Sequence, residues 1–198
     1  MRTWLQIIGW LACAVYSTIP AFWVMIHPFA GRWRSHRRSP YRVLLPLWIA
    51  MWIVMALITR PWHRITIYQT PWSWAPAIPL FVVGLFLYSK SGKHFSAKQL
   101  GGQPEIHGAN RDQKLVTEGV RSRVRHPVYL AHLCEILAWS LGTGLAVCWA
   151  LTAFAILTGA VMIQMEDAEL ERRFGDSYRA YRHSVPAVLP RLWEARQL

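Results

Sequence analysis

The sequence predicts an all-α, polytopic membrane protein with five transmembrane helices, a cytoplasmic loop and a C-terminal helix at the membrane interface. Three observations support this fold class. Of the 198 residues, 54% are hydrophobic, a high share for a soluble domain. The hydrophobic residues form long runs, and about 20 apolar residues are enough to cross a bilayer. Charged residues lie in blocks between these runs.

Five apolar runs follow one another along the chain, with a Gly-Thr-Gly break between the last two. The fourth is shorter than a full span, so it must tilt, lie partly within protein or extend into the preceding loop. Together with the fifth it is expected to form a helical hairpin. The first has no small-residue cleavage site after it, so we expect it to be retained as a span. The runs lie at 4–26, 43–59, about 75–89, 128–141 and 145–164.

The net charge of +12 could indicate nucleic-acid binding, but its distribution favours a membrane. Lys and Arg concentrate in the first and third connections between spans. Residues 31–42 hold five Arg and no acid, and residues 90–127 hold eight Lys and Arg against three acids. Cytoplasmic loops carry such an excess. We therefore expect the lipid bilayer as partner, no nucleic acid, the N-terminus outside, and the tail in the cytoplasm.

Arg125 and His126 precede Pro127 at the mouth of the fourth span. Proline suits the first turn of a helix, whose free N–H groups and dipole favour an anion. Arg125 and His126 would add donors there, and Tyr129 follows half a turn later. In the alternative interpretation, Arg125 reaches lipid phosphates and Tyr129 belongs to an interfacial aromatic belt.

Glu135 is the only Asp, Glu, Lys or Arg within the five apolar runs, and His132 lies three residues earlier on the same helical face. A carboxylate within the membrane is costly and marks a candidate functional residue. A structural pair of Glu135 with His132 or with a Trp is the alternative.

Two acids, Glu166 and Asp167, stand where the fifth span leaves the membrane, and such a pair suits a cationic ligand. Glu169 and Arg173 have the spacing of an ordinary surface ion pair. Beyond them, aromatic residues recur at helical spacing opposite Arg, which predicts an amphipathic interfacial helix. No P-loop, Rossmann, nucleophile-elbow or zinc-protease motif is present, and no metal site is expected.

Two segments carry a family resemblance. "KLVTEGVRSRVRHPVYLAHL" and, after the hairpin, "MEDAELERRFGDSYRAYRHSVPAVLP" together span residues 114–190, about two fifths of the chain. In motif order and spacing they resemble the isoprenylcysteine carboxyl methyltransferase and phospholipid methyltransferase superfamily. The resemblance implies an integral membrane enzyme that uses S-adenosylmethionine and releases S-adenosylhomocysteine. One domain, 1–198, would then hold three N-terminal spans (1–89) and a methyltransferase core (90–190).

The resemblance also implies a set of cofactor-binding residues. Glu166 would take the α-amino group of the cofactor. The residues lining the pocket would be Gln113, Lys114, Leu115, Val116, His126, Pro127, Val128 and Tyr129.

Two positions depart from the family pattern. Arg121 stands where the family usually has Tyr, and Met162 stands where prenylcysteine methyltransferases carry a substrate-binding Arg. The second change argues against a prenylcysteine carboxylate as substrate but leaves methyl transfer intact. Arg121 is the candidate substrate-binding residue.

The expected chemistry is displacement at the methyl group by a lipophilic acceptor. Glu135 or His132 would take the proton of an amine or thiol, whereas a carboxylate acceptor would need a cation such as Arg121 or Arg125. Arg125, His132 and Glu135 are thus the candidate catalytic residues. A phospholipid N-methyltransferase and a non-catalytic scaffold are alternatives. A reductase would predict nicotinamide binding and a larger membrane domain.

Overall fold

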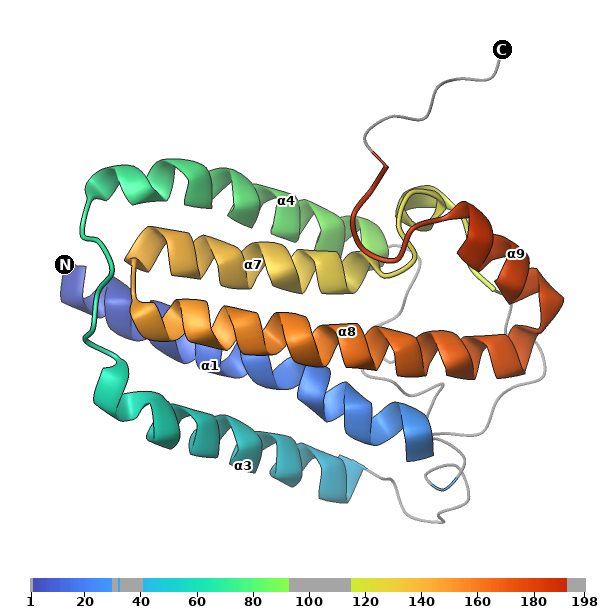
Figure 1. The fold of residues 1–198 in the computed structure, drawn as a ribbon, viewed down its shortest axis with the longest axis horizontal. Coiled ribbons are helices and arrows are strands. Elements are labelled where there is room, and N and C mark those ends of the chain that lie inside the picture. Colours follow the sequence, from blue (N-terminus) through green and yellow to red (C-terminus); the bar gives the residue numbers. More distant parts are fainter. Residues whose placement is uncertain (1, 30–31, 33–40, 93–114, 192–198) are drawn as a thin grey trace.

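The computed structural model describes residues 2–29, 32, 41–92 and 115–191, and within these ranges the chain folds into helices and connections without a strand (Figure 1). The predicted all-α class is confirmed. The long helices are α1 (Arg2–Ile26), α3 (Tyr41–Thr59), α4 (Trp74–Gly92), α7 (Pro127–Thr143) and α8 (Ala146–Phe174), followed by the short α9 (Asp176–Ser184). Single 3-10 turns are η1 (His27–Phe29), η2 (Arg60–Trp62), η3 (Pro71–Ser73) and η4 (Gly119–Ser122).

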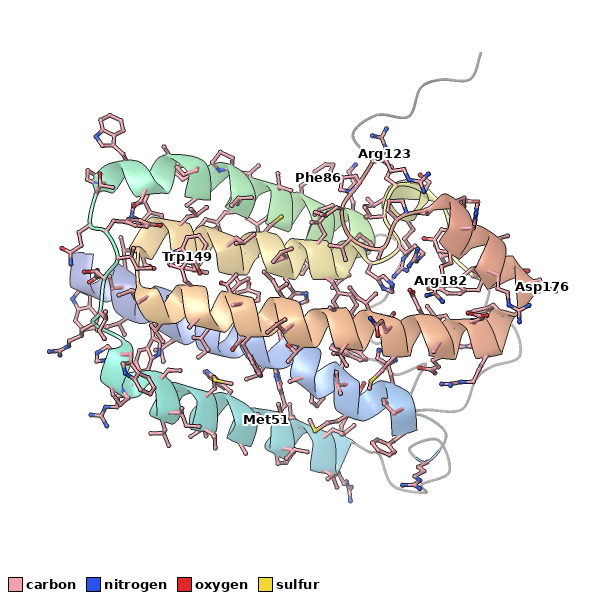
Figure 2. The ribbon with its side chains drawn as sticks, in the orientation of Figure 1. Met51, Phe86, Arg123, Trp149, Asp176 and Arg182 are labelled. Carbon is pink, nitrogen blue, oxygen red and sulfur yellow. The ribbon has the colours of Figure 1, made fainter. Side chains whose placement is uncertain are left out.

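The long helices form a bundle with α7 near its centre. Helix α7 packs against α4, α1 and α8, while α3 packs mainly on α1 (Figure 1). Many apolar side chains of α3 and α4 remain exposed, including Phe86 on the outer side of α4 (Figure 2). An apolar outer surface of this kind suits lipid rather than water.

Four of the long helices, all except α7, are long and apolar enough to cross a membrane, which supports an integral membrane protein. Helix α7 has 17 residues, or about 25 Å at 1.5 Å per residue, against a hydrocarbon thickness of about 30 Å. Its neighbours cover much of it, in line with the expectation that the short fourth run lies partly within protein.

The predicted hairpin between α7 and α8 is present. Gly144 ends α7 with a φ of +63°, and a Cβ there would collide with the carbonyl of Tyr68. The connection between α3 and α4 runs along this turn, because Ile67 N–H donates to the Gly144 carbonyl at 2.8 Å and Ala146 N–H donates to the Ile65 carbonyl at 2.9 Å.

The long helices alternate in direction, which divides their ends into two groups (Figure 1). The N-terminus, the connection between α3 and α4, and the α7–α8 turn lie at one end of the bundle. The start of α7, the end of α8 and α9 lie at the other. This grouping matches the predicted order of five spans. Which end faces the cytoplasm stays a prediction.

Candidate active site

His126 lies between two carboxylates at the start of α7. Its Nδ1 atom is 3.2 Å from Oε2 of Glu166, and its Nε2 atom is 2.9 Å from Oδ1 of Asp167. Burial by itself would lower the pKa of His126, but the charges of Glu166 and Asp167 and their hydrogen bonds outweigh it and raise the pKa to about 9. His126 is therefore an imidazolium at neutral pH, with a proton on each nitrogen.

The buried side chain of Asp167, on α8, contacts residues of two other elements, the segment before α7 and α9. Arg125 donates from Nη2 to Oδ2 at 2.7 Å, and the Tyr178 hydroxyl on α9 donates to Oδ1, the oxygen that His126 also contacts. Arg182, which lies on α9 near the end of α8 (Figure 2), brings its Nε atom within 3.7 Å of Oδ2. The carboxylate thus ties the mouth of α7 to the tail.

The tail also binds the mouth of α7 through the backbone. Arg125 N–H donates to the Pro186 carbonyl and His126 N–H to the Ala187 carbonyl, both at 2.9 Å. The guanidinium of Arg125 donates to the Val185 carbonyl at 2.6 Å. These bonds hold residues 185–187 against the entrance of the helix.

Several of the donors expected to serve an anion at the start of α7 have partners within the protein. The N–H groups of Tyr129 and Leu130 donate to the His126 carbonyl, and those of Arg125 and His126 are used by the tail. The side chains of Arg125 and His126, expected as donors for an anionic ligand, face carboxylates of α8 instead. Among the described residues, the side chains of Arg125 and His126 are therefore paired with carboxylates of α8.

His27 brings the first helix into the same cluster. It follows α1 directly and is buried, with Nδ1 at 2.9 Å from Oε2 of Glu169 and Nε2 at 4.0 Å from Oε2 of Glu166. Its ring stacks on Trp23 at a centroid distance of 5.3 Å. Glu169 is buried beside His27, so the expectation of a surface position for Glu169 was wrong.

Sequence reasoning singled out neither His27 nor Tyr178 as a site residue, and it noted Asp167 only as half of an acidic pair. A histidine just past an apolar run was the one available signal for His27. Nothing in the spacing indicates its partner, because His27 and Glu169 are 142 residues apart.

Glu166 is the acid of the pair that remains accessible. Its side chain is 20% exposed, against 4% for Asp167. Its Oε2 atom is buried and faces Nδ1 of His126 at 3.2 Å and Nε2 of His27 at 4.0 Å. A partly exposed carboxylate beside an enclosed imidazolium fits the ammonium group of a ligand.

Comparison with known proteins points to a family. A protein-S-isoprenylcysteine O-methyltransferase of Schizosaccharomyces pombe is 31% identical over 141 residues, 63% of this chain and 50% of that protein. Protein-S-isoprenylcysteine O-methyltransferase B of Arabidopsis thaliana is 38% identical over 82 residues, 39% of this chain and 40% of that protein. The resemblance to the isoprenylcysteine carboxyl methyltransferase family is confirmed.

The matches are partial. The chain spans half the length of the first relative and less of the second. An uncharacterized protein of Haemophilus influenzae is 36% identical over 59 residues, which make up 94% of it. No family model and no solved structure matches the chain. Because each named match covers only part of an enzyme, it does not by itself assign the activity or substrate of this chain.

Some of the positions that the family resemblance assigns to the cofactor lie next to His126, and others lie in the segment before η4. Tyr129 stacks on His126, with ring centroids 5.5 Å apart and planes at 27°. Pro127 is buried at the first position of α7. Leu115 packs in a small apolar core with Tyr178 and Tyr181, and Val116 follows it, half-buried. Gln113 and Lys114 lie outside the described residues.

Arg121 and Met162 are the two departures from the family pattern. Arg121 lies in η4, where its Nη1 atom donates to the Arg125 carbonyl at 3.1 Å and its own carbonyl accepts from Tyr181 at 2.7 Å. It therefore stands at the entrance beside the cluster. Met162 is fully buried within α8, so this position contributes packing and no charge.

The remaining candidates, His132 and Glu135, lie deeper in α7. Nδ1 of His132 donates to the Val128 carbonyl at 2.7 Å, so a neutral ring would carry its lone pair on Nε2. Glu135 is 5% exposed, and its Oε1 atom has no hydrogen-bond partner among the described residues. The alternative of a structural bond from His132 to this oxygen is therefore not what the structure forms.

Proposed function

We propose that this chain is an integral membrane methyltransferase that uses S-adenosylmethionine and methylates a lipophilic acceptor. The observation that carries the proposal is the accessible Glu166 carboxylate beside the His126 imidazolium. The methyltransferase names of the two relatives support the same reaction class. A bundle with an apolar outer surface suits an acceptor that arrives from the bilayer.

Glu166 would hold the α-amino group of the cofactor. Tyr129, Pro127 and Val128 would form the wall on the side of α7, and Leu115 and Val116, with Gln113 and Lys114 before them, would form the wall on the side of the loop. Once bound, S-adenosylmethionine supplies a methyl group already activated as a sulfonium. What the protein must add is positioning and the exclusion of water.

Arg125 fits a positioning role better than the catalytic role expected from the sequence, because Asp167 and the tail carbonyls occupy its guanidinium. Arg121 stays on the acceptor side of the proposed site. His132 and Glu135 remain the proton acceptors for an acceptor that must lose a proton.

We also propose that the end of the bundle that carries this cluster faces the cytoplasm, where the cofactor is available. The Lys- and Arg-rich connections at 31–42 and 90–127, which the sequence predicts to be cytoplasmic, support this orientation. Fused after residue 198, a reporter that works only in the cytoplasm should be active, and a reporter that works only outside the cytoplasm should be inactive. The opposite result would show that the topology is reversed.

Calorimetric titration with S-adenosylhomocysteine tests the proposed function. Detergent-purified protein should bind one equivalent, and Glu166→Gln should weaken binding about tenfold or more because it removes the charge opposite an ammonium. Asp176→Asn is the control, since the Asp176 side chain is 94% exposed and pairs with Arg179, outside the cluster. No binding by folded protein would instead favour a non-catalytic scaffold.

A further inference from the structure

A groove lies between α3 and the start of α8, at the end of the bundle opposite the His126 cluster (Figure 1). Its volume is about 400 Å³, within the usual range for small-molecule sites. Two features of the fold leave this space. Helix α3 packs mainly on α1, and the face of α8 that lines the groove carries the small side chains of Ala146 and Ala150.

The walls of the groove suit a hydrocarbon chain. Lining residues of α8 extend from Val147 to Phe154, a length of about 10 Å at 1.5 Å per residue. On the side of α3, the Thr59 hydroxyl already accepts from Nε1 of Trp10 at 2.8 Å and donates to the Met55 carbonyl at 2.7 Å. Because α3 and α8 are both candidate membrane spans, the groove faces the bilayer and runs inward from its surface.

Two arginines flank the mouth of this groove. Arg60 follows Thr59 directly and Arg64 precedes Ile65, and both Thr59 and Ile65 line the groove. The two arginine side chains are exposed. The backbone that carries them is fastened to the first turn of α8, because Ala146 N–H donates to the Ile65 carbonyl at 2.9 Å. The mouth is therefore built before any ligand arrives.

The positive charge at this mouth has no counterpart in the chain. The sequence has no Asp or Glu within 1–104 or 136–165, and these ranges contain every described segment at this end. Arg60 and Arg64 also run against the usual charge bias, since this end is predicted to face outward and cytoplasmic loops carry the excess of Lys and Arg. A guanidinium at the membrane surface binds phosphate well, because it offers several donors in one planar fork.

We infer that the groove binds one anionic phospholipid, with an acyl chain between α3 and α8 and the phosphate between Arg60 and Arg64. Two cations without a carboxylate favour a head group of net negative charge. A zwitterionic head group would bring a cation that finds no acid there. The bound lipid fills the space between the helices and ties α3 to α8. It is not the methyl acceptor, because Glu166 lies at the other end of the bundle, and the inference does not depend on the proposed function.

Lipid binding by the detergent-purified full chain tests the inference. Delipidated protein is titrated with dioleoylphosphatidylglycerol or dioleoylphosphatidylcholine, and bound lipid is counted by native mass spectrometry. We expect one phosphatidylglycerol to bind about tenfold more tightly than phosphatidylcholine. The double variant Arg60→Gln and Arg64→Gln should lose this preference. The matched control, Arg123→Gln and Arg172→Gln, removes the same charge from exposed positions near the other end and should keep it (Figure 2).

A second pair of variants tests the groove itself. Ala150→Trp places an indole on the wall of the groove and should weaken phosphatidylglycerol binding about tenfold, because the ring takes the space of the acyl chain. Ala160→Trp is the matched control, since Ala160 is exposed on the same helix and does not line the groove. Binding by this control should equal that of the unchanged chain.

Three results would overturn the inference. They are equal binding of the two lipids by the unchanged chain, a preference that survives the loss of Arg60 and Arg64, and a preference that the control at Arg123 and Arg172 abolishes. The arginine variants alter only exposed side chains, so they decide the question even if Ala150→Trp does not fold. None of these results depends on binding of S-adenosylhomocysteine, so the proposed function stands or falls separately.

Discussion

Nδ1 of His27 lies 2.9 Å from Oε2 of Glu169, and this contact joins the end of the first helix to the distal part of α8. Both side chains are buried. Because Glu166 lies one turn before Glu169 on the same helix, His27 also approaches the proposed cofactor-binding acid. The first span is therefore more than an anchor, which supports treating the whole chain as one domain.

Replacing His27 by alanine should weaken binding of S-adenosylhomocysteine about tenfold, because Glu166 and Glu169 lose a neighbour that orients them. His27→Gln keeps a donor and should lose less. Calorimetry on detergent-purified variants measures the difference. His183→Ala serves as the control, since His183 is exposed on α9 near the same end. If all variants bound S-adenosylhomocysteine with equal affinity, the first helix would have no part in the proposed cofactor site.

Asp167→Asn should destabilise the fold by about 3 kcal/mol, because it leaves the buried cations Arg125 and His126 without their shared counter-charge. Thermal unfolding in detergent gives the comparison. Asp176→Asn is the matched control: Asp176 is 94% exposed on α9 and pairs with Arg179. The control should stay within about 0.5 kcal/mol of the unchanged protein. An equal effect of the two substitutions would contradict a structural role for the cluster.

The spans and the hairpin could be predicted from sequence because a bilayer imposes one dominant requirement, a long apolar run, on each helix. Glu166 and His126 could be proposed as site residues from sequence because their motifs are local. The partners of His126 could not, since they depend on how α8 and the tail pack against the start of α7. For Glu169 the sequence spacing gave a wrong prediction. Its ion-pair spacing with Arg173 predicted a surface position, but packing against His27 buries the side chain.

The start of α7 shows a second limit of sequence reasoning. Helix N-termini carry unsatisfied N–H groups, so an anion site there was a sound expectation. The residues that use the neighbouring donors, Pro186 and Ala187, lie some 60 positions later in an irregular segment. No periodicity in that segment indicates where its carbonyls point.

Stability should fall as the pH rises from about 6.5 to 9, because of His126. The folded-state pKa of His126 is raised to about 9, above its ordinary value of 6.5. Its stabilisation by Glu166 and Asp167 is therefore complete below pH 6.5 and is lost as the pH rises through 9. Thermal midpoints across this range should show the loss, and His126→Gln should flatten it. A midpoint that is constant from pH 6 to 9 in the unchanged protein would contradict a charged His126.

Gly142→Ala should destabilise the end of the bundle opposite the site, because a Cβ there would lie 2.6 Å from Cε3 of Trp74. The expected cost is about 1–3 kcal/mol, typical of overpacking. Gly159→Ala is the matched control within α8, where the nearest atom, Cγ of Pro20, is 4.0 Å from the new Cβ. That change should be neutral or stabilise by up to about 1 kcal/mol through helix propensity. Thermal unfolding separates the two, and binding of S-adenosylhomocysteine below the unfolding temperature should stay unchanged in both, because Gly142 lies at the far end of α7. Weaker binding in Gly142→Ala alone would show that the two ends of the bundle are coupled.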